Sequence, residues 1–199
     1  VFPNTLPFKI NLKKIATRFI AVMRESGQLP SMYHGAVTKS ILDEIRKQTG
    51  RVFHSTQPDA FVAFALPAFY NTAINIGYPV TVSGRSPKSN SAVAYGKDSR
   101  VNTEKMLQEY EGYKIHPTLF PGIDLLANVI QDAVLVAMDK FPNFYKSVRF
   151  NYNAMWAFIV SQAGYFKWNI SIKEIIQKRQ EIRNYHPFSI FQFLKYCII

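Results

Sequence analysis

The chain has 199 residues and a formal net charge of +11, with 24 lysines and arginines against 13 aspartates and glutamates. Its 48% hydrophobic and 15% aromatic residues can bury a substantial core, which excludes an intrinsically disordered polypeptide. The longest apolar runs, 60–70 and 123–138, are too short or too interrupted to cross a bilayer, so no transmembrane segment is predicted. The positive charge favours an anionic partner, whether nucleic acid, lipid headgroups or a phosphorylated ligand.

The N-terminus and the cysteine usage predict a cytoplasmic protein. The sequence begins Val-Phe-Pro and lacks the basic, apolar and small-residue regions of a signal peptide, so we expect a chain cut from a longer one. The single cysteine, Cys197, cannot form an internal disulfide, which agrees with a reducing compartment. The charge also allows a place at the inner face of the membrane.

Residues 1–100 read as a mixed α/β region. An apolar stripe at three- and four-residue spacing predicts a helix over 11–25, and a second helix should begin at Thr38 or Ser40 and end at Thr49-Gly50. A short strand over 51–54 should lead to a helix that starts at Pro58-Asp59 and is buried over 61–70. A strand over 78–82 then precedes the loop 83–91.

Residues 101–199 read as a helical region. Helical patterns cover 102–110, 122–140, 145–164 and 171–183, and neither a repeat nor a low-complexity tract is present. The predicted fold class is therefore α/β for residues 1–100, followed by a mostly helical C-terminal region over 101–199.

Several kinds of chemistry can be excluded from the sequence. One cysteine and four scattered histidines do not give the spacing of a structural zinc site, so no metal ligand is predicted in this chain. There is also no phosphate-binding loop, dinucleotide fingerprint or nucleophile elbow. The pair Asp43-Glu44 lies among Lys39, Arg46 and Lys47, which indicates a solvated, ion-paired helix face.

Two places remain as candidate functional residues. Asp59 stands where a polar run meets an apolar helix, and it is either a helix-capping carboxylate or a general base. In the loop 83–91, Arg85 and Lys88 lie among small hydroxyl residues. That loop could grip a phosphate through charge-assisted hydrogen bonds, or it could be a flexible surface linker.

Residues 28–95 contain, in order, Tyr33-His34-Gly35, the stretch from Ser40 to Gly50, Val52-Phe53, Pro58-Asp59 and the loop from Ser83 to Ser91. This order of features resembles the distal half of the family 2, GT-A-like glycosyltransferases. A subgroup associated with surface-polysaccharide synthesis is especially similar, through the S-x-x-P-D of Ser55 to Asp59 and the S-G-x-S-x-x-S of Ser83 to Ser89. The resemblance implies an inverting transfer of a sugar from a nucleotide sugar to a saccharide or lipid-linked acceptor.

By the same resemblance, Asp59 would be the catalytic base, and Arg85 with Lys88 would contact the donor diphosphate. His34, Gly35 and His54 would lie near the sugar-binding cleft, while Ser86 replaces a histidine often found in that loop. The family holds a divalent metal, Mn²⁺ or Mg²⁺, with an Asp-x-Asp motif on its nucleotide-binding half. This chain has no such motif, so most of the donor site and the metal should lie upstream.

Two alternatives of other classes remain open. The basic residues in the helices 12–24 and 172–183 would suit a nucleic-acid-binding module, although no recognised motif supports one. The second alternative is a helical interaction protein without catalytic activity, which would dimerise through an exposed apolar surface. The same basic residues would also support peripheral association with an anionic membrane.

Overall fold

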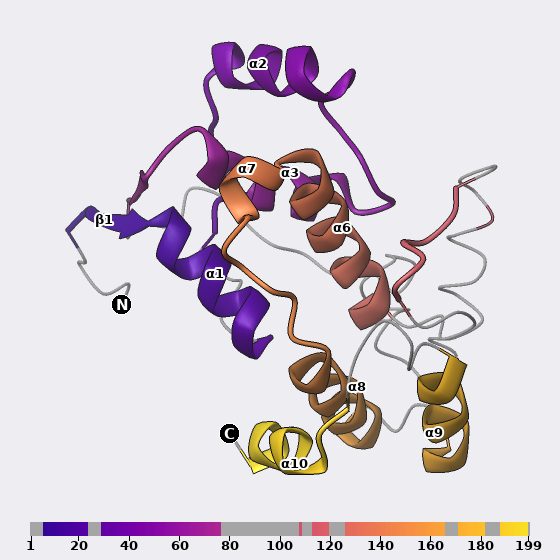
Figure 1. The fold of residues 1–199 in the computed structure, drawn as a ribbon. Helices are drawn as coiled ribbons and strands as arrows, with labels where there is room; N and C mark the ends of the chain where they lie inside the picture. Colours follow the sequence, from indigo (N-terminus) through magenta and orange to yellow (C-terminus); the bar gives the residue numbers. More distant parts are fainter. Residues whose placement is uncertain are drawn as a thin grey trace, which may run out of the picture.

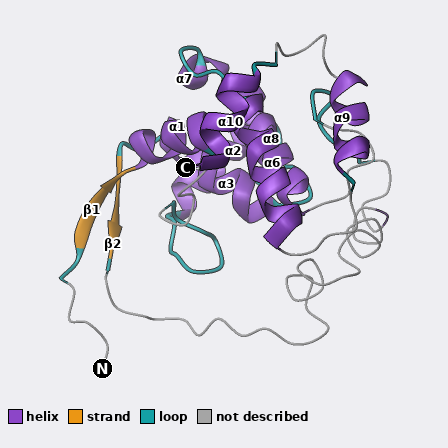
Figure 2. Ribbon diagram, turned by 90° about the horizontal axis from the view of Figure 1, so that it is seen from below, coloured by secondary structure: helices purple, strands orange, loops and turns teal. Residues whose placement is uncertain are grey.

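The computed structural model describes residues 6–23, 29–76, 108, 113–119, 126–165, 171–181 and 188–198. Helices dominate these residues, and a two-stranded antiparallel sheet projects from them (Figures 1 and 2). The elements are β1 (Phe8–Asn11), α1 (Leu12–Val22), α2 (Lys39–Thr49), α3 (Pro58–Ala65), the 3₁₀ turn η2 (Leu66–Ala68), β2 (Thr72–Asn75), α6 (Leu126–Lys140), α7 (Pro142–Tyr145), α8 (Tyr152–Tyr165), α9 (Ile172–Glu181) and α10 (Ile190–Ile198).

The sheet joins two segments that are more than sixty residues apart in sequence. Phe8 pairs with Asn75, and the ladder continues inward to the pair of Asn11 with Thr72. The backbone N–H of Leu12 then donates to the carbonyl of Asn71 at 2.9 Å, which ties the start of α1 to the chain ahead of β2. Neither strand was predicted from the sequence.

The predicted first two helices are present, although α1 ends at Val22 and not at residue 25, because Met23 adopts a left-handed conformation with φ of +56°. In α1 the side chain of Asn11 caps the helix by accepting the backbone N–H of Lys14 at 2.8 Å. In α2, Thr38 is the N-cap residue and Gly50 ends the helix with φ of +86°. The exposed face of α2 carries the expected ion pairs, including Lys39 to Asp43 at 2.5 Å.

The predicted strand over residues 51–54 is wrong, because these residues form a turn between α2 and α3. The Thr49 hydroxyl donates toward the carbonyl of Arg51 at 2.7 Å, and the Arg51 guanidinium donates to Nδ1 of His54 at 3.2 Å. Ser55 has φ of +64°, a left-handed conformation that ends any extended run. Local side-chain hydrogen bonds thus replace the ladder of a strand.

The buried helix predicted over 61–70 is shorter than expected. Helix α3 ends at Ala65, and the 3₁₀ turn η2 follows. Pro67 lacks a backbone N–H and cannot continue the α-helical bonding, which accounts for the change. Pro58 occupies the first turn of α3 as predicted.

The core is built around α3, because residues 61–65 of this helix are all buried. Helix α3 packs against α6, and the Tyr145 hydroxyl at the end of α7 donates to the carbonyl of Phe64 at 2.6 Å. Buried residues on both sides of position 100, from Ile10 to Ile159, belong to one hydrophobic cluster. Figure 1 shows α3 between α2, α6 and α7.

The helix predicted over 145–164 begins later than expected, because α8 starts at Tyr152 and the non-helical residues 146–151 separate it from the end of α7 at Tyr145. Asn151 explains the break, because its side chain accepts the backbone N–H of Ala154 at 3.0 Å and so begins α8. Its amide also donates to the carbonyl of Ala21 at 2.7 Å, and its backbone N–H donates to Ile20 at 3.3 Å. Asn151 therefore caps α8 and the C-terminal end of α1 at once.

The last helices complete the fold. Helices α6 and α9 lie within their predicted ranges, whereas α10, which packs against α8, was not predicted. None of the described helices combines the length and the apolar character that a membrane span requires. The predicted strand over 78–82, the loop 83–91 and, apart from residue 108, the helix over 102–110 lie outside the described residues.

The described residues therefore show helices with a small sheet, and the C-terminal region is helical as expected. The GT-A-like arrangement and the division at residue 100 stay predictions.

Gly50 provides a direct test of the α2 C-cap. A Cβ at this position would meet no atom within 4 Å, so the cost of a side chain is purely conformational. We expect Gly50→Ala to lower the free energy of unfolding by about 1 kcal/mol in urea titration. Gly50→Asn should cost less, since asparagine tolerates the left-handed region, and equal losses for both variants would contradict this account.

Candidate functional site

A stripe of polar residues runs along α6 inside the core. Asn128, Gln131 and Asp132 follow the i, i+3, i+4 spacing of one helix face, and their exposed fractions are 0%, 1% and 0%. Asp139 lies seven residues beyond Asp132 on the same helix, and its side chain is 68% exposed. The buried carboxylate of Asp132 and the solvent-exposed carboxylate of Asp139 therefore lie on the same helix.

Asp132 is the centre of a buried hydrogen-bond network. Its Oδ2 accepts the hydroxyl of Ser55 at 2.7 Å and also the hydroxyl of Tyr113. Its Oδ1 accepts the backbone N–H of His116 at 2.7 Å. These three donors come from two segments that are distant in sequence, so Asp132 holds both of them against α6.

Tyr113 serves this network as a donor. Burial raises the pKa of its phenol well above the ordinary value, and the hydrogen bond to Asp132 and the charge of that carboxylate raise it further. The hydroxyl therefore keeps its proton at neutral pH and offers it to Asp132. A buried carboxylate needs such donors, because an unpaired one would carry a desolvation cost.

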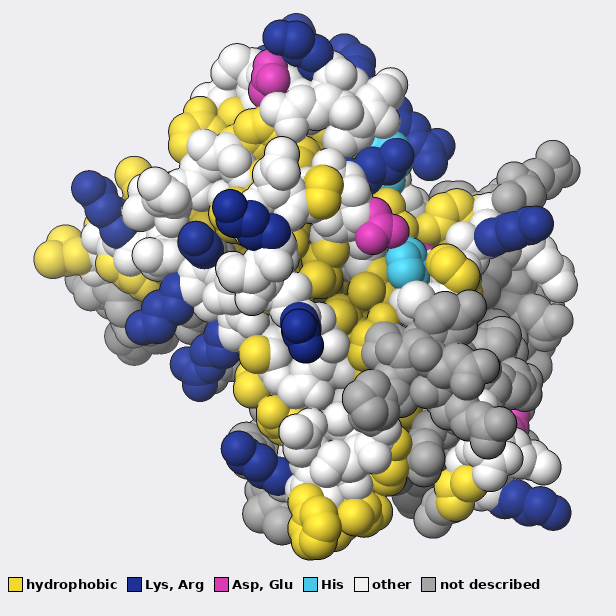
Figure 3. Space-filling model, in the orientation of Figure 1, with side chains coloured by type: hydrophobic (Ala, Val, Ile, Leu, Met, Phe, Trp, Pro, Cys, Tyr) yellow, Lys and Arg dark blue, Asp and Glu magenta, His cyan; other side chains and the backbone are white. Residues whose placement is uncertain are grey.

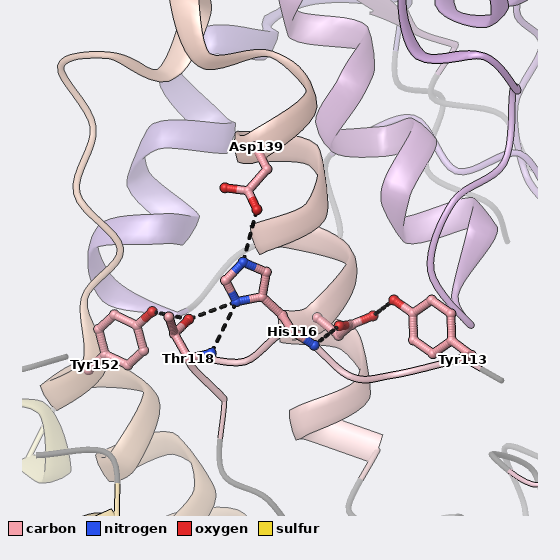
Figure 4. Close-up of polar contacts among 6 residues, drawn as sticks. Tyr113, His116, Thr118, Asp139 and Tyr152 are labelled. Atoms are coloured by element: carbon pink, nitrogen blue, oxygen red, sulfur yellow. Dashed lines mark hydrogen bonds and ion pairs between the residues drawn. The ribbon is translucent and has the colours of Figure 1, made fainter. Parts of the chain in front are cut away.

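His116 connects the network to the surface. Its Nδ1 accepts the backbone N–H of Thr118 at 3.3 Å, which makes Nδ1 the unprotonated nitrogen. The proton on Nε2 then points to Asp139 at 2.9 Å, and the Thr118 hydroxyl, 2.7 Å from Nδ1, can donate to it. Tyr152 donates in turn to the Thr118 hydroxyl at 2.7 Å (Figure 4).

The pKa of Tyr152 is raised to about 12, chiefly because the phenol is buried. The hydroxyl therefore remains a donor at neutral pH. The hydroxyls of Tyr152 and Thr118, the imidazole of His116 and the carboxylate of Asp139 form a series of hydrogen bonds. This series resembles the arrangement that activates a nucleophilic hydroxyl. Here, however, Thr118 is only two residues from His116 and also donates its backbone N–H to it. These hydrogen bonds are better explained as contacts that fix the conformation of the 116–118 turn. Asp139 remains accessible to solvent.

Two buried oxygens beside this network have no hydrogen-bond partner within the described part of the chain. They are Oγ1 of Thr56 and Oε1 of Gln131, the sequence neighbours of Ser55 and Asp132. An unsatisfied buried polar atom costs on the order of 1–3 kcal/mol, so these two oxygens reduce the stability that the network provides.

The sequence-predicted base, Asp59, lies in the first turn of α3 and is half-buried. Four residues ahead of it, Ser55 is bonded to Asp132, and Ser55 also accepts the backbone N–H of Gln57 at 3.3 Å. The bond from Ser55 to Asp132 ties the segment that leads into Asp59 to α6, while the bond from Gln57 lies within that segment. The Asp59 carboxylate is therefore partly exposed and follows a segment that is tied to α6.

His54 lies in a buried, partly aromatic environment. It is only 5% exposed, its ring packs 4.7 Å from that of Phe61, and Arg51 donates to its Nδ1. Its Nε2 therefore carries the proton and lies 2.9 Å from the Thr49 hydroxyl. Both ring nitrogens contact other side chains, which favours a structural role in the turn over contact with a sugar.

His34 and Gly35 lie in an exposed turn ahead of α2, where the His34 backbone N–H donates to the carbonyl of Ser31 at 3.1 Å. A Cβ on Gly35 would come within 2.9 Å of that same oxygen, so the turn requires glycine at this position. Backbone packing is therefore sufficient to explain Gly35.

The remaining predicted residues, Arg85, Ser86 and Lys88, lie outside the described residues. Within the described part of the chain, no group of three His, Cys, Asp or Glu side chains is placed to hold a metal ion.

Comparison of the chain with protein-family models, with curated proteins and with solved structures gave no match. The assignment of a function therefore depends on the motifs and on the geometry of the described residues.

Asp132, Tyr113, His116, Thr118, Asp139 and Tyr152 were not singled out as site residues from the sequence. A signal for Asp132 is nevertheless present, because Asn128, Gln131 and Asp132 interrupt an apolar run at helical spacing. Polar residues that share one face with buried positions on either side predict a buried network. The partners on 113–118 could not be found this way, because that segment has no regular periodicity.

The Asp132 network should be important for stability. We expect Asp132→Asn, which keeps the shape but removes the charged acceptor, to lower the free energy of unfolding by about 2–3 kcal/mol in urea titration. Asp139→Asn, on the same helix but mostly exposed, is the matched control and should cost under about 1 kcal/mol. Similar losses for the two variants would contradict a central role for Asp132.

The buried His54 should make stability depend on pH. Burial, aided by the charges of Arg51 and Lys140, lowers the pKa of His54 below its ordinary value. As pH falls through the unfolded pKa, the unfolded chain binds a proton that the folded chain does not, so stability is present at higher pH and is lost toward lower pH.

The urea midpoint at about pH 7.5 and about pH 5.5 measures this effect. We expect His54→Gln to reduce the loss of stability at the lower pH, while His34→Gln, at an exposed position, should leave the wild-type pH dependence in place. A His54 variant with an unchanged pH dependence would show that other groups cause it.

Proposed function

We propose that this chain is the acceptor-side part of an inverting, family 2-like glycosyltransferase of surface-polysaccharide synthesis. Its substrates would be a nucleotide sugar and a saccharide or lipid-linked acceptor. The observation that carries the proposal is the placement of Asp59, half-buried in the first turn of α3 at the Pro58-Asp59 motif, with Ser55 fixed to the buried Asp132 at 2.7 Å.

The support of the Asp59 segment suits a catalytic base. A base must be held within hydrogen-bonding reach of the hydroxyl it deprotonates, and small displacements reduce the rate strongly. Asp132 restrains this segment through Ser55, and the opposite end of the motif is fixed because Phe61 and the rest of α3 are buried. A capping carboxylate alone would not need this support, although it would tolerate it.

The surroundings of Asp59 offer polar groups for a saccharide. Asp132 binds Ser55 and His116 together, so the 113–118 segment lies beside the segment that leads to Asp59. The exposed carboxylate of Asp139, held against His116, is a hydrogen-bond acceptor of the kind that binds sugar hydroxyls.

In the proposed reaction, the Asp59 carboxylate takes the proton of an acceptor hydroxyl as that oxygen forms a bond to the anomeric carbon of the donor. The bond from this carbon to the nucleoside diphosphate breaks, and the diphosphate leaves with the electron pair. Arg85 and Lys88 are proposed to bind that leaving group. A divalent metal, Mn²⁺ or Mg²⁺, would supply further charge for the diphosphate from the nucleotide-binding half, since this chain has no Asp-x-Asp motif.

Asp59→Asn tests the assignment in a reading frame extended upstream of this chain. We expect sugar transfer from a panel of UDP- and GDP-sugars to fall by about 10³-fold or more, because the amide cannot accept the proton. Calorimetry with the same donors and Mn²⁺ should show unchanged donor binding, and urea titration should show a folded protein.

Asp43→Asn, in an exposed ion pair of α2, is the matched control and should retain transfer. Near-normal turnover of the Asp59 variant would remove Asp59 as the base. Absence of donor binding by the extended protein, together with salt-sensitive binding of DNA or RNA, would favour the nucleic-acid-binding alternative instead.

A further inference from the structure

The free end of the two-stranded ribbon exposes large apolar side chains. Leu6 is 86% exposed, Phe8 49%, Ile74 67% and Ile76 45%. Phe8 pairs with Asn75 while Ile74 pairs with Lys9, so Phe8 and Ile74 point to opposite faces of the ribbon. Apolar surface is therefore present on both faces of the part that projects from the helices (Figure 2).

The attached end of the ribbon behaves differently. Ile10, two residues further along β1 than Phe8, is 8% exposed and belongs to the core. The ribbon is thus anchored at one end and solvated at the other. Exposed apolar residues gathered at a projecting end need an explanation that scattered single ones do not.

Basic residues continue from this apolar end to the start of α1. Lys9 lies in β1, and Lys13 and Lys14 lie in the first turn of α1 at the anchored end; all three are exposed, and the Lys13 ammonium lies 5.7 Å from the centroid of the Phe144 ring. No aspartate or glutamate occurs in residues 6–23 or 66–76. Figure 3 shows dark blue lysine and arginine side chains around the yellow apolar tip at the left, with the acidic side chains of this view elsewhere.

This combination of apolar and basic groups matches one kind of partner best. Nucleic acid would use the lysines but gains nothing from exposed leucine and isoleucine, since its outer surface is charged phosphate. An ordinary apolar protein patch would use the isoleucines but not the lysines. An anionic bilayer uses both, because acyl chains accept the apolar side chains and headgroups attract the lysines.

We propose that the ribbon surface, made of Leu6, Phe8, Lys9, Lys13, Lys14, Ile74 and Ile76, docks this protein onto the surface of an anionic membrane. The apolar end enters the boundary between headgroups and acyl chains, and the lysine ammonium groups remain among the headgroups. This surface is independent of the proposed transfer reaction, although a lipid-linked acceptor would be presented at the same bilayer.

The test measures binding of the purified chain to vesicles by co-sedimentation. We expect binding to vesicles of phosphatidylcholine mixed with phosphatidylglycerol, and much weaker binding to phosphatidylcholine alone. Each exposed lysine is worth about fivefold in affinity near an anionic surface, so Lys13→Gln with Lys14→Gln should weaken binding by about 25-fold. Raising sodium chloride from about 0.1 M to about 0.5 M should weaken wild-type binding as well.

The apolar contribution is tested by the double variant Phe8→Ser with Ile74→Ser, which changes only exposed side chains. We expect it to weaken vesicle binding by at least about tenfold, since each buried methylene contributes to membrane affinity. Its control is Phe191→Ser on α10, where Phe191 is 82% exposed but lies on another element. Urea titration of every variant confirms that folding is intact.

The proposal is overturned if the chain does not bind anionic vesicles, if the ribbon variant binds as tightly as the wild type, or if Phe191→Ser causes the same loss. Equal binding to neutral and anionic vesicles would also overturn it. The chain could instead bind RNA. If the variant Lys13→Gln with Lys14→Gln loses RNA binding but keeps vesicle binding, the lysines would be assigned to nucleic acid. None of these results depends on sugar transfer, so failure here leaves the Asp59 assignment unaffected.

Discussion

The polar part of this structure depends on the hydrogen bonds of one fully buried carboxylate, that of Asp132. Removing a carboxylate from water is costly unless donors replace the lost solvent, and Asp132 meets this requirement with three of them. Because the donors belong to Ser55, Tyr113 and His116, satisfying one side chain of α6 fixes two irregular segments. These segments have no ladder or helical bonding of their own that would hold them in place.

The same principle operates at Asn151, on the other side of the core. Helix ends leave backbone groups without partners, and these must be supplied from elsewhere. Asn151 satisfies an N–H of α8 and carbonyl groups at the end of α1, which are about 130 residues apart in sequence. Asp132 and Asn151 thus join distant parts of the chain through polar atoms.

The helices that could be predicted from the sequence are those with a clear periodicity and clear ends. Helix α1 shows an apolar stripe, and α2 has both an N-cap threonine and a glycine that adopts φ of +86°. The 51–54 segment misled the prediction because Val52 and Phe53 are typical strand residues. In the structure the hydrogen bonds of Thr49, Arg51 and His54 decide the conformation, and such contacts are invisible to propensity.

The site was predictable only where one residue's local context carries the signal. Asp59 could be found because its position ahead of an apolar helix is a local pattern, and it does lie in the first turn of α3. The network that supports it could not, because Tyr113 and His116 become neighbours of Ser55 only through the packing of α3 on α6. A sequence can therefore indicate a candidate base while giving no information on what holds it.

The ribbon shows why some apolar side chains remain exposed in a chain that has a well-filled core. An isolated pair of strands is marginally stable in water, and here it is stabilised at the end where Ile10 enters the core and Leu12 bonds to Asn71. Among the described residues no third strand extends the sheet, so nothing in that layer covers Phe8 or Ile74. Side chains that were selected for packing alone would be expected nearer the anchored end. Their presence at the free end, in segments without acidic residues, is therefore the observation on which the proposed membrane docking depends.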